Sequence, residues 1–189
     1  MDIDRILNDR QKQLLARWQE KIFSTYPSDS ARLYVKEQDA FANPVGRTIA
    51  DQTEILLKLF IDHAASQELA DALMPVVKIR AIQFSCPSAA LAFVPLLKHV
   101  IREVVPDLPS DTSDSAEWLR LDSRIDEMLL ATFDCYAKCR EEVANLRVRE
   151  TVRHVSGLLR RVGAEPWLAV EEAATPPAMC DTAGRMRQP

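Results

Sequence analysis

An apolar pattern with helical spacing runs through residues 114–162 and constrains the fold more than any other feature of this chain. The apolar and aromatic positions of its first half are Trp118, Leu121, Ile125, Met128, Leu129, Phe133 and Tyr136. An ordinary globular helix has roughly 8–20 residues, so this segment is long for a helix that packs on one core. We predict one half that packs on a core to about Cys139 and a second half that protrudes.

Most of the remaining chain is also predicted to be helical. Only 4 of its 189 residues are glycine, and the residues that dominate it (Ala, Leu, Glu, Arg and Lys) favour helix. Apolar periodicity predicts helices over residues 3–23, 30–38, 44–64, 66–84 and 89–105. Pro75 and Pro95 fall inside the last two and should kink or restart them.

These elements predict an all-α, single helical domain with a long C-terminal helix. We expect a core over residues 1–140, a protruding amphipathic helix over 141–163 and a flexible tail over 164–189. The segment 66–84 is apolar on nearly all sides, so its apolar residues, Ile82 among them, should be well buried.

Composition and charge exclude several classes of protein. A net charge of -4 argues against bulk nucleic-acid binding. No apolar run reaches the roughly 18 residues of a membrane span. The N-terminal sequence MDIDRILNDRQK lacks the apolar core and cleavage site of a secretory signal. We therefore expect a cytoplasmic protein, in which the cysteines (Cys86, Cys135, Cys139 and Cys180) are thiols.

The sequence FANPVG, residues 41–46, separates two helical patterns. Asn43 is a preferred N-cap residue, and Pro44 suits the first helical position because it has no amide to leave unpaired. Gly46 and Ala50 are small and one turn apart, so another backbone could approach them closely. We interpret the motif as a helix start with a packing notch; the alternative is a ligand or partner contact.

Cys135 and Cys139 lie one turn apart on one helix face, which would suit a thiol redox pair or half a metal site. A zinc site needs about four ligands, and no second Cys/His pair is near in sequence. We therefore favour small side chains at a helix interface. None of His63, His99 and His154 is placed as a clear haem ligand, and we expect no cofactor and no metal.

Charged residues inside otherwise apolar helices can likewise have a structural role or belong to a functional site. We expect a solvated edge or salt bridges, with an anion or partner site as the alternative, for Arg80, Lys98, Arg102 and Glu103. Paired carboxylates can do acid–base work, but Asp122, Asp126 and Glu127 have no nucleophile set or glycine-rich loop beside them. We interpret them as a solvated face and expect no enzyme activity.

The distal part of the long helix carries a heptad-like seam. Its positions step by four and three residues and are Asn145, Val148, Val152, Val155, Leu159 and Val162. This spacing is typical of the a and d positions of a coiled coil, where a buried Asn often sets the register. The seam predicts a dimer or a partner helix; the alternative is a helix that packs back on its own domain.

Three blocks resemble the RsbRD N-terminal domain family, named for a co-antagonist of the RsbT kinase in bacterial stress signalling. They are FANPVG (41–46), RAIQFSCPSAALAFVPLLKHVIRE (80–103) and SRIDEMLLATFDCYAKCREEVANLRVRE (123–150), and the resemblance covers about residues 3–155. It implies an input domain placed ahead of an effector such as a STAS or kinase domain. It also implies a globin-like fold that binds no haem and forms a homodimer.

Residues and resemblance together predict a non-enzymatic sensor that responds to a small ligand or a signalling partner and acts through association. The alternatives are a haem- or thiol-based redox sensor and a helical adaptor of a larger complex. The residues after Val162 are too few for a STAS or kinase domain, so we expect the effector to be missing from this sequence.

Overall fold

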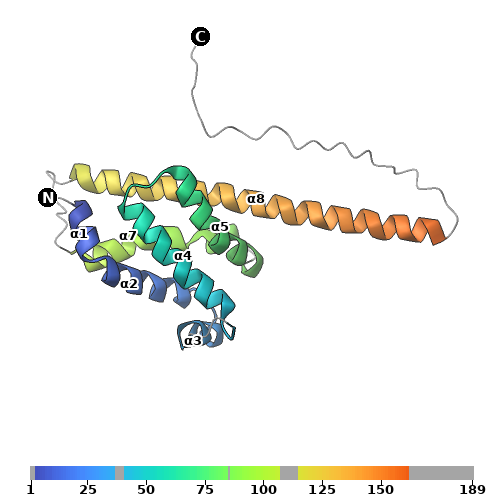
Figure 1. Cartoon of the computed structure of the whole chain (residues 1–189), viewed down its shortest axis with the longest axis horizontal. Coiled ribbons are helices and arrows are strands. Elements are labelled where there is room, and N and C mark those ends of the chain that lie inside the picture. The colour runs from blue at the N-terminus through green and yellow to red at the C-terminus, as the bar shows by residue number, and fades with distance from the viewer. Residues whose placement is uncertain (1–2, 37–40, 85, 107–114, 162–189) are drawn as a thin grey trace, which may run out of the picture. The chain divides into compact units, whose positions relative to one another are not determined.

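The computed structural model describes residues 3–36, 41–84, 86–106 and 115–161, and within these it contains helices and no strand (Figure 1). The helices are α1 (Ile3–Asp9), α2 (Gln11–Ser24), α3 (Ser28–Lys36), α4 (Pro44–Ile61), α5 (Ser66–Gln83), α6 (Pro87–Leu91), α7 (Phe93–Val104) and α8 (Ser115–Arg161). The predicted all-α fold with a long C-terminal helix is confirmed. The predicted tail, 164–189, lies outside the described residues.

By its internal contacts the chain divides into two units, residues 1–144 and 145–189. The first unit contains α1 to α7 and the first part of α8. The described part of the second unit is the remainder of α8. The predicted division of roles between a sensor core, a protruding helix and a tail stays a prediction, as does the globin-like arrangement.

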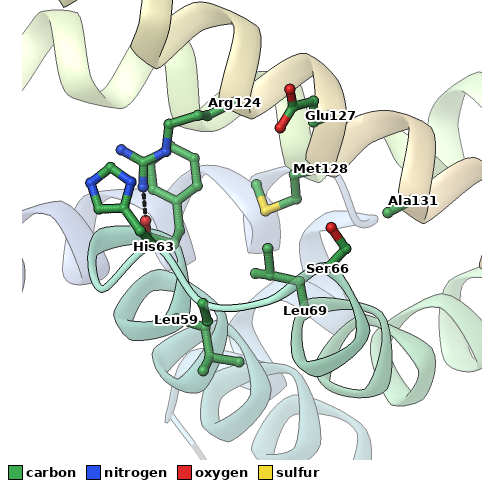
Figure 2. A pocket seen from close by; sticks show the side chains of 10 residues that line it. Leu59, His63, Ser66, Leu69, Arg124, Glu127, Met128 and Ala131 are labelled. Carbon is green, nitrogen blue, oxygen red and sulfur yellow. Dashed lines mark hydrogen bonds between the residues drawn. The ribbon is translucent and has the colours of Figure 1, made fainter. Parts of the chain in front are cut away.

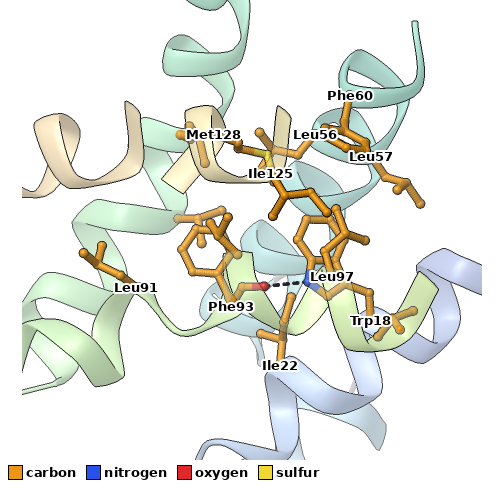
Figure 3. Packing of buried hydrophobic residues seen from close by; sticks show 14 of the residues in the cluster. Trp18, Ile22, Leu56, Leu57, Phe60, Leu91, Phe93, Leu97, Ile125 and Met128 are labelled. Carbon is orange, nitrogen blue, oxygen red and sulfur yellow. Dashed lines mark hydrogen bonds between the residues drawn. The ribbon is translucent and has the colours of Figure 1, made fainter. Parts of the chain in front are cut away.

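The core of the first unit forms where α2, α4, α7 and α8 bring their apolar faces together (Figure 3). Trp18, Phe93, Leu97 and Ile125 are completely buried there. The indole Nε1 of Trp18 donates to the backbone oxygen of Phe93 at 2.7 Å, which satisfies the polar atom of a buried ring. Burial of each large apolar side chain stabilises the fold by roughly 1.5–3 kcal/mol.

The first predicted helix, residues 3–23, is divided at Arg10 into α1 and α2. Helical hydrogen bonding continues across the division, since the Arg10 amide bonds to the Ile6 oxygen at 3.1 Å and the Leu14 amide to the Arg10 oxygen at 2.9 Å. The Arg10 guanidinium donates to the Val104 oxygen at the end of α7. A tertiary contact therefore accompanies a break that periodicity does not indicate.

The expected central helix, 89–105, is also divided: α6 ends at Leu91 and α7 begins at Phe93. Pro95 has no amide to donate to the Leu91 carbonyl four residues earlier, and its ring crowds that carbonyl. The break falls just ahead of the proline, so that Pro95 lies in the first turn of α7, where a missing amide costs little.

Arg80 stabilises this break from inside the core. Its side chain is completely buried, with Nε donating to the Ala90 oxygen at 2.6 Å and Nη2 donating to the Ala89 oxygen at 2.8 Å. The guanidinium also lies 4.5 Å from the centre of the Phe84 ring. No acidic side chain of the described residues pairs with it. The predicted solvated edge is therefore wrong for Arg80, and burial lowers the pKa of its guanidinium.

Two further expectations about burial are wrong. The side chain of Ile82 is 79% exposed, because it points away from the buried face of α5, which carries Leu73, Val76 and Val77. On α8, Phe133 is 53% exposed rather than part of the core stripe. The buried positions of that helix are Leu121, Ile125, Met128, Thr132, Cys135, Tyr136 and Cys139.

Candidate functional site

A cavity of about 190 Å³ lies within the first unit, where the end of α4, the start of α5 and α8 meet (Figure 2). Its apolar lining is Leu59, Phe60, Ala64, Leu69, Met128 and Ala131, and its polar lining is His63, Ser66, Arg124 and Glu127. At about 30 Å³ for each water, this is room for about six waters. Pockets for drug-sized ligands begin at roughly 300 Å³, so the cavity suits a smaller molecule.

His63 forms the turn between α4 and α5. Its φ of 53° lies in the left-handed region, and no other non-glycine residue of the described chain has a positive φ. The Ala64 amide bonds to the Leu59 oxygen at 3.0 Å, the hydrogen bond of helix ends that usually close on glycine. For a residue with a side chain this conformation costs roughly 1–2 kcal/mol. The turn thereby places an imidazole, rather than a bare glycine, at the cavity.

Arg124 reaches the cavity from α8 and is already engaged by protein groups. Its Nη1 lies 3.3 Å from Oδ1 of Asp4, and its Nη2 donates to the Phe60 oxygen at the end of α4. The guanidinium also stacks 4.5 Å from the centre of the Phe60 ring. Oδ2 of Asp4 lies 3.0 Å from Nε2 of His63. A single carboxylate of α1 therefore contacts both basic side chains of the cavity.

Glu127 has a different environment from the other two carboxylates that the sequence groups with it. Asp122 and Asp126 turn toward α7, where Nζ of Lys98 lies 2.9 Å from the first and 2.8 Å from the second. Glu127 lines the cavity, and among the described residues its carboxylate has no ion pair or hydrogen bond. Asp126 and Glu127 are exposed and Asp122 is half-buried, so the predicted solvated face is confirmed, and Glu127 additionally lines the cavity.

The FANPVG motif forms the predicted helix start. Oδ1 of the buried Asn43 accepts from the Gly46 amide at 2.9 Å, and Pro44 is the first residue of α4. Nδ2 of Asn43 donates to the Tyr34 oxygen of α3 at 3.1 Å. A Cβ at Gly46 would lie only 2.4–2.8 Å from Asn43 side-chain atoms. The cap is confirmed and explains the glycine; a purely structural role for the motif stays a prediction.

The two cysteines of α8 face α5. Cys135 Sγ lies 3.7 Å from the Ala70 oxygen and Cys139 Sγ lies 3.6 Å from Met74 Sδ. Both side chains are buried, and burial raises the pKa of each thiol. Because the thiolate is the form that reacts and binds metal, this environment favours the interface role over a redox pair.

Among the described residues, the histidines and other potential metal ligands form no candidate site besides the cavity. His63, His99 and His154 are all exposed, and His63 is the histidine that lines the cavity. No group of three or more His, Cys, Asp or Glu side chains is arranged to hold a metal within the described ranges. None of the helices described there has both the length and the apolar character needed to cross a membrane.

In a comparison with known families, residues 12–151 match the RsbT co-antagonist protein rsbRD N-terminal domain. The chain belongs to this family. The match covers most of the chain and includes the Asn43 motif, the cavity and the two α8 cysteines. Searches of curated proteins and of solved structures found no significant match. The resemblance seen in the sequence is therefore confirmed, and with it the coarse function of a stress-signalling input domain of the sigma-factor regulatory pathway.

The predicted seam of this RsbRD N-terminal domain is exposed in the described chain. Val148, Val152 and Val155 are 61%, 37% and 41% exposed, Asn145 is exposed and Leu159 is half-buried. Val162 lies outside the described residues. The family match ends at residue 151, within the seam. The structure shows accessible apolar side chains at these positions, and their pairing stays a prediction.

Sequence reasoning did not predict the cavity of this RsbRD N-terminal domain. Its residues come from two segments, 59–69 and 124–131, whose proximity depends on tertiary packing. From the sequence, His63 is only one of three histidines of which none is a clear haem ligand. Only the structure shows that a histidine takes the left-handed position at this helix end, where glycine is the usual residue.

Proposed function

We propose that this RsbRD N-terminal domain senses a small ligand in the cavity between α4, α5 and α8 and signals through protein–protein association. The supporting observation is that the same helix, α8, lines the cavity and also carries the apolar surface through which association is proposed. α8 contributes Arg124, Glu127, Met128 and Ala131 to the cavity and continues to Arg161 with exposed apolar side chains. A ligand that binds one arrangement of α8 more tightly than another would shift the population of association-competent molecules.

The proposed action is non-enzymatic, cytoplasmic and independent of a cofactor. A catalytic site needs a nucleophile or a general base within hydrogen-bond reach of a reacting group and a partner that orients it. In the cavity, Arg124 and His63 are both engaged by Asp4, and no cysteine lines it. These contacts support binding rather than group transfer.

The proposed association is a homodimer formed through the seam on α8. An isolated helix of this length is marginal in water, and each seam side chain contributes at most roughly 1.5–3 kcal/mol when it becomes buried. Burial of the exposed valines against a second apolar surface would therefore stabilise the helix. The matching seam of another copy is the simplest such surface.

Light scattering on the full chain tests this association. The parent should be a dimer at tens of micromolar, and Val152→Asp/Val155→Asp should be a monomer, because two carboxylates cannot be buried in an apolar seam. Thr151→Asp/His154→Asp is the matched control, since it places the same charges at exposed positions of α8 outside the seam. A parent that is monomeric, or a seam variant that stays dimeric, would exclude this interface.

An acidic partner is a second candidate, favoured by the charge of the same segment. Arginines Arg147, Arg149, Arg153, Arg160 and Arg161 are all exposed. Glu150 is the only acidic residue between 145 and 161. Such a surface attracts an acidic protein by electrostatic complementarity and repels a second copy of itself in a parallel pair.

A further inference from the structure

The cavity of the first unit carries a negative charge for which the described residues provide no counter-charge. Arg124 is paired with Asp4, which also contacts Nε2 of His63. Glu127 is exposed to solvent where it lines the cavity, and it has neither an ion pair nor a hydrogen bond within the described part of the chain. The end of α4 and the start of α5 contribute partial charges of about −0.5 and +0.5, which offset each other. The electrostatics of the cavity therefore favour a cation.

The other residues that line the cavity indicate the chemical nature of the rest of the ligand. Leu59, Leu69, Met128 and Ala131 present aliphatic or thioether surface. The hydroxyl of Ser66, at the start of α5, makes no hydrogen bond that the structure describes. Figure 2 shows Glu127 on α8 and Ser66 on α5, with the side chain of Met128 between them. A ligand that fits has a charged donor at one end and a short apolar body.

We propose that the cavity binds a small primary amine in its protonated form, with a short aliphatic chain against the apolar lining. The ammonium group would donate to the Glu127 carboxylate. This inference rests on the proposed function, whose ligand it names by chemical class. The volume of about 190 Å³ admits a chain of a few carbons and lies below the roughly 300 Å³ at which pockets for drug-sized ligands begin.

A carboxylate ligand fits these contacts less well. Arg124 would be its natural partner, but two nitrogens of that guanidinium already donate to Asp4 and to the Phe60 oxygen. The face of the guanidinium is covered by the Phe60 ring. A bound carboxylate would also lie close to Glu127, and like charges in a small cavity repel.

Isothermal titration calorimetry with three probes of equal chain length tests the class. The full chain is titrated at neutral pH with n-pentylamine, pentanoate and 1-pentanol. We expect saturable one-to-one binding of n-pentylamine, with both other probes at least about ten-fold weaker, since a hydrogen bond to a charged group exceeds one to a neutral group by about this factor. Binding of pentanoate or of 1-pentanol as tight as that of the amine would overturn the proposal.

Two isosteric variants locate the site. Glu127→Gln should weaken amine binding about ten-fold or more, while Glu141→Gln, an equal charge change at an exposed position of the same helix, should leave it unchanged. Equal loss in both variants would indicate a non-specific surface effect and overturn the site. Absence of amine binding beside a seam-dependent dimer would reject the ligand class alone. Amine binding by a chain that stays monomeric would support the ligand class and reject the proposed homodimer.

Discussion

Asn43 and Gly46 are coupled by a single close approach, which gives a prediction at the scale of residues. Asn43→Ala should cost about 0.5–2 kcal/mol through the lost cap. Gly46→Ala should also destabilise, because its Cβ would lie 2.4 Å from Asn43 Nδ2 and displace the capping side chain. In the Asn43→Ala background that collision is gone, and alanine is favoured over glycine in a helix by roughly 0.5–1 kcal/mol.

Urea denaturation of the parent, both single variants and the double variant measures this coupling. We expect the Gly46→Ala cost to fall by about 0.5–2 kcal/mol when residue 43 is alanine. Strict additivity would show that residue 46 is constrained by something other than the cap. Loss of a partner or ligand with unchanged stability in both single variants would instead support the binding interpretation of the motif.

Thiol reactivity is a second property decided by individual residues. Cys86 is exposed, and a hydrogen bond with the Ser88 hydroxyl at 3.0 Å lowers the pKa of its thiol. Burial raises the pKa of Cys135 and Cys139. Brief iodoacetamide treatment near neutral pH, followed by peptide mapping, should therefore modify Cys86 well before the two α8 cysteines.

Ser88→Ala is the control for this labelling order, and it should slow the modification of Cys86 while leaving the two buried thiols unchanged. Labelling after unfolding in urea should reach Cys135 and Cys139 readily, since burial is the cause of their protection. The redox-sensor alternative would be supported if those two cysteines were labelled rapidly in the folded chain. It would also be supported if mild oxidation produced a Cys135–Cys139 disulfide.

The break between α6 and α7 gives a prediction at the scale of elements. Arg80→Met removes the donors that hold the Ala89 and Ala90 oxygens. A buried carbonyl without a partner costs about 1–3 kcal/mol, so this variant should lose about 2–6 kcal/mol. Pro95→Ala should change stability by less than about 1 kcal/mol, because the first turn of a helix needs no amide there.

Chemical denaturation compares these variants with Lys78→Met, which removes an exposed positive charge from the same helix as Arg80. This control should stay within about 0.5 kcal/mol of the parent. A cost for Pro95→Ala as large as that for Arg80→Met would contradict the view that the first turn of α7 tolerates residue 95 without an amide. The expected order shows that Arg80 stabilises the carbonyl groups that the break leaves free.

Salt dependence distinguishes the two association modes at the scale of the whole molecule. The exposed arginines between residues 145 and 161 repel their copies in a parallel homodimer. Raising the ionic strength from about 0.01 M to about 1 M shortens the Debye length from about 30 Å to about 3 Å. The dimer should therefore strengthen with added salt, as measured by analytical ultracentrifugation of the full chain.

The matched variant is Arg149→Gln/Arg153→Gln, which removes two of these charges and should tighten the dimer at low salt while reducing its salt response. Dimerisation that weakens as salt rises would contradict repulsion across a parallel pair. An association with acidic proteins that weakens with salt, beside a monomeric chain, would instead support the second candidate function.

Much of the local structure follows from the sequence by itself. Helical periodicity predicts most of the elements, and Asn43 followed by Pro44 predicts the start of α4, because capping depends on residues close together in the chain. The family is also recognisable from the three sequence blocks. These features need no knowledge of which helix contacts which.

Only the tertiary structure decided which polar groups are buried, paired or left free. Periodicity treats Arg80 and Glu127 alike, as charges on helices, yet packing encloses the first among carbonyl groups and leaves the second beside a cavity. The cavity itself joins the turn at His63 to α8, although α5, α6 and α7 lie between them in the chain order. Such sites depend on how helices distant in sequence pack together, which neither residue spacing nor composition encodes.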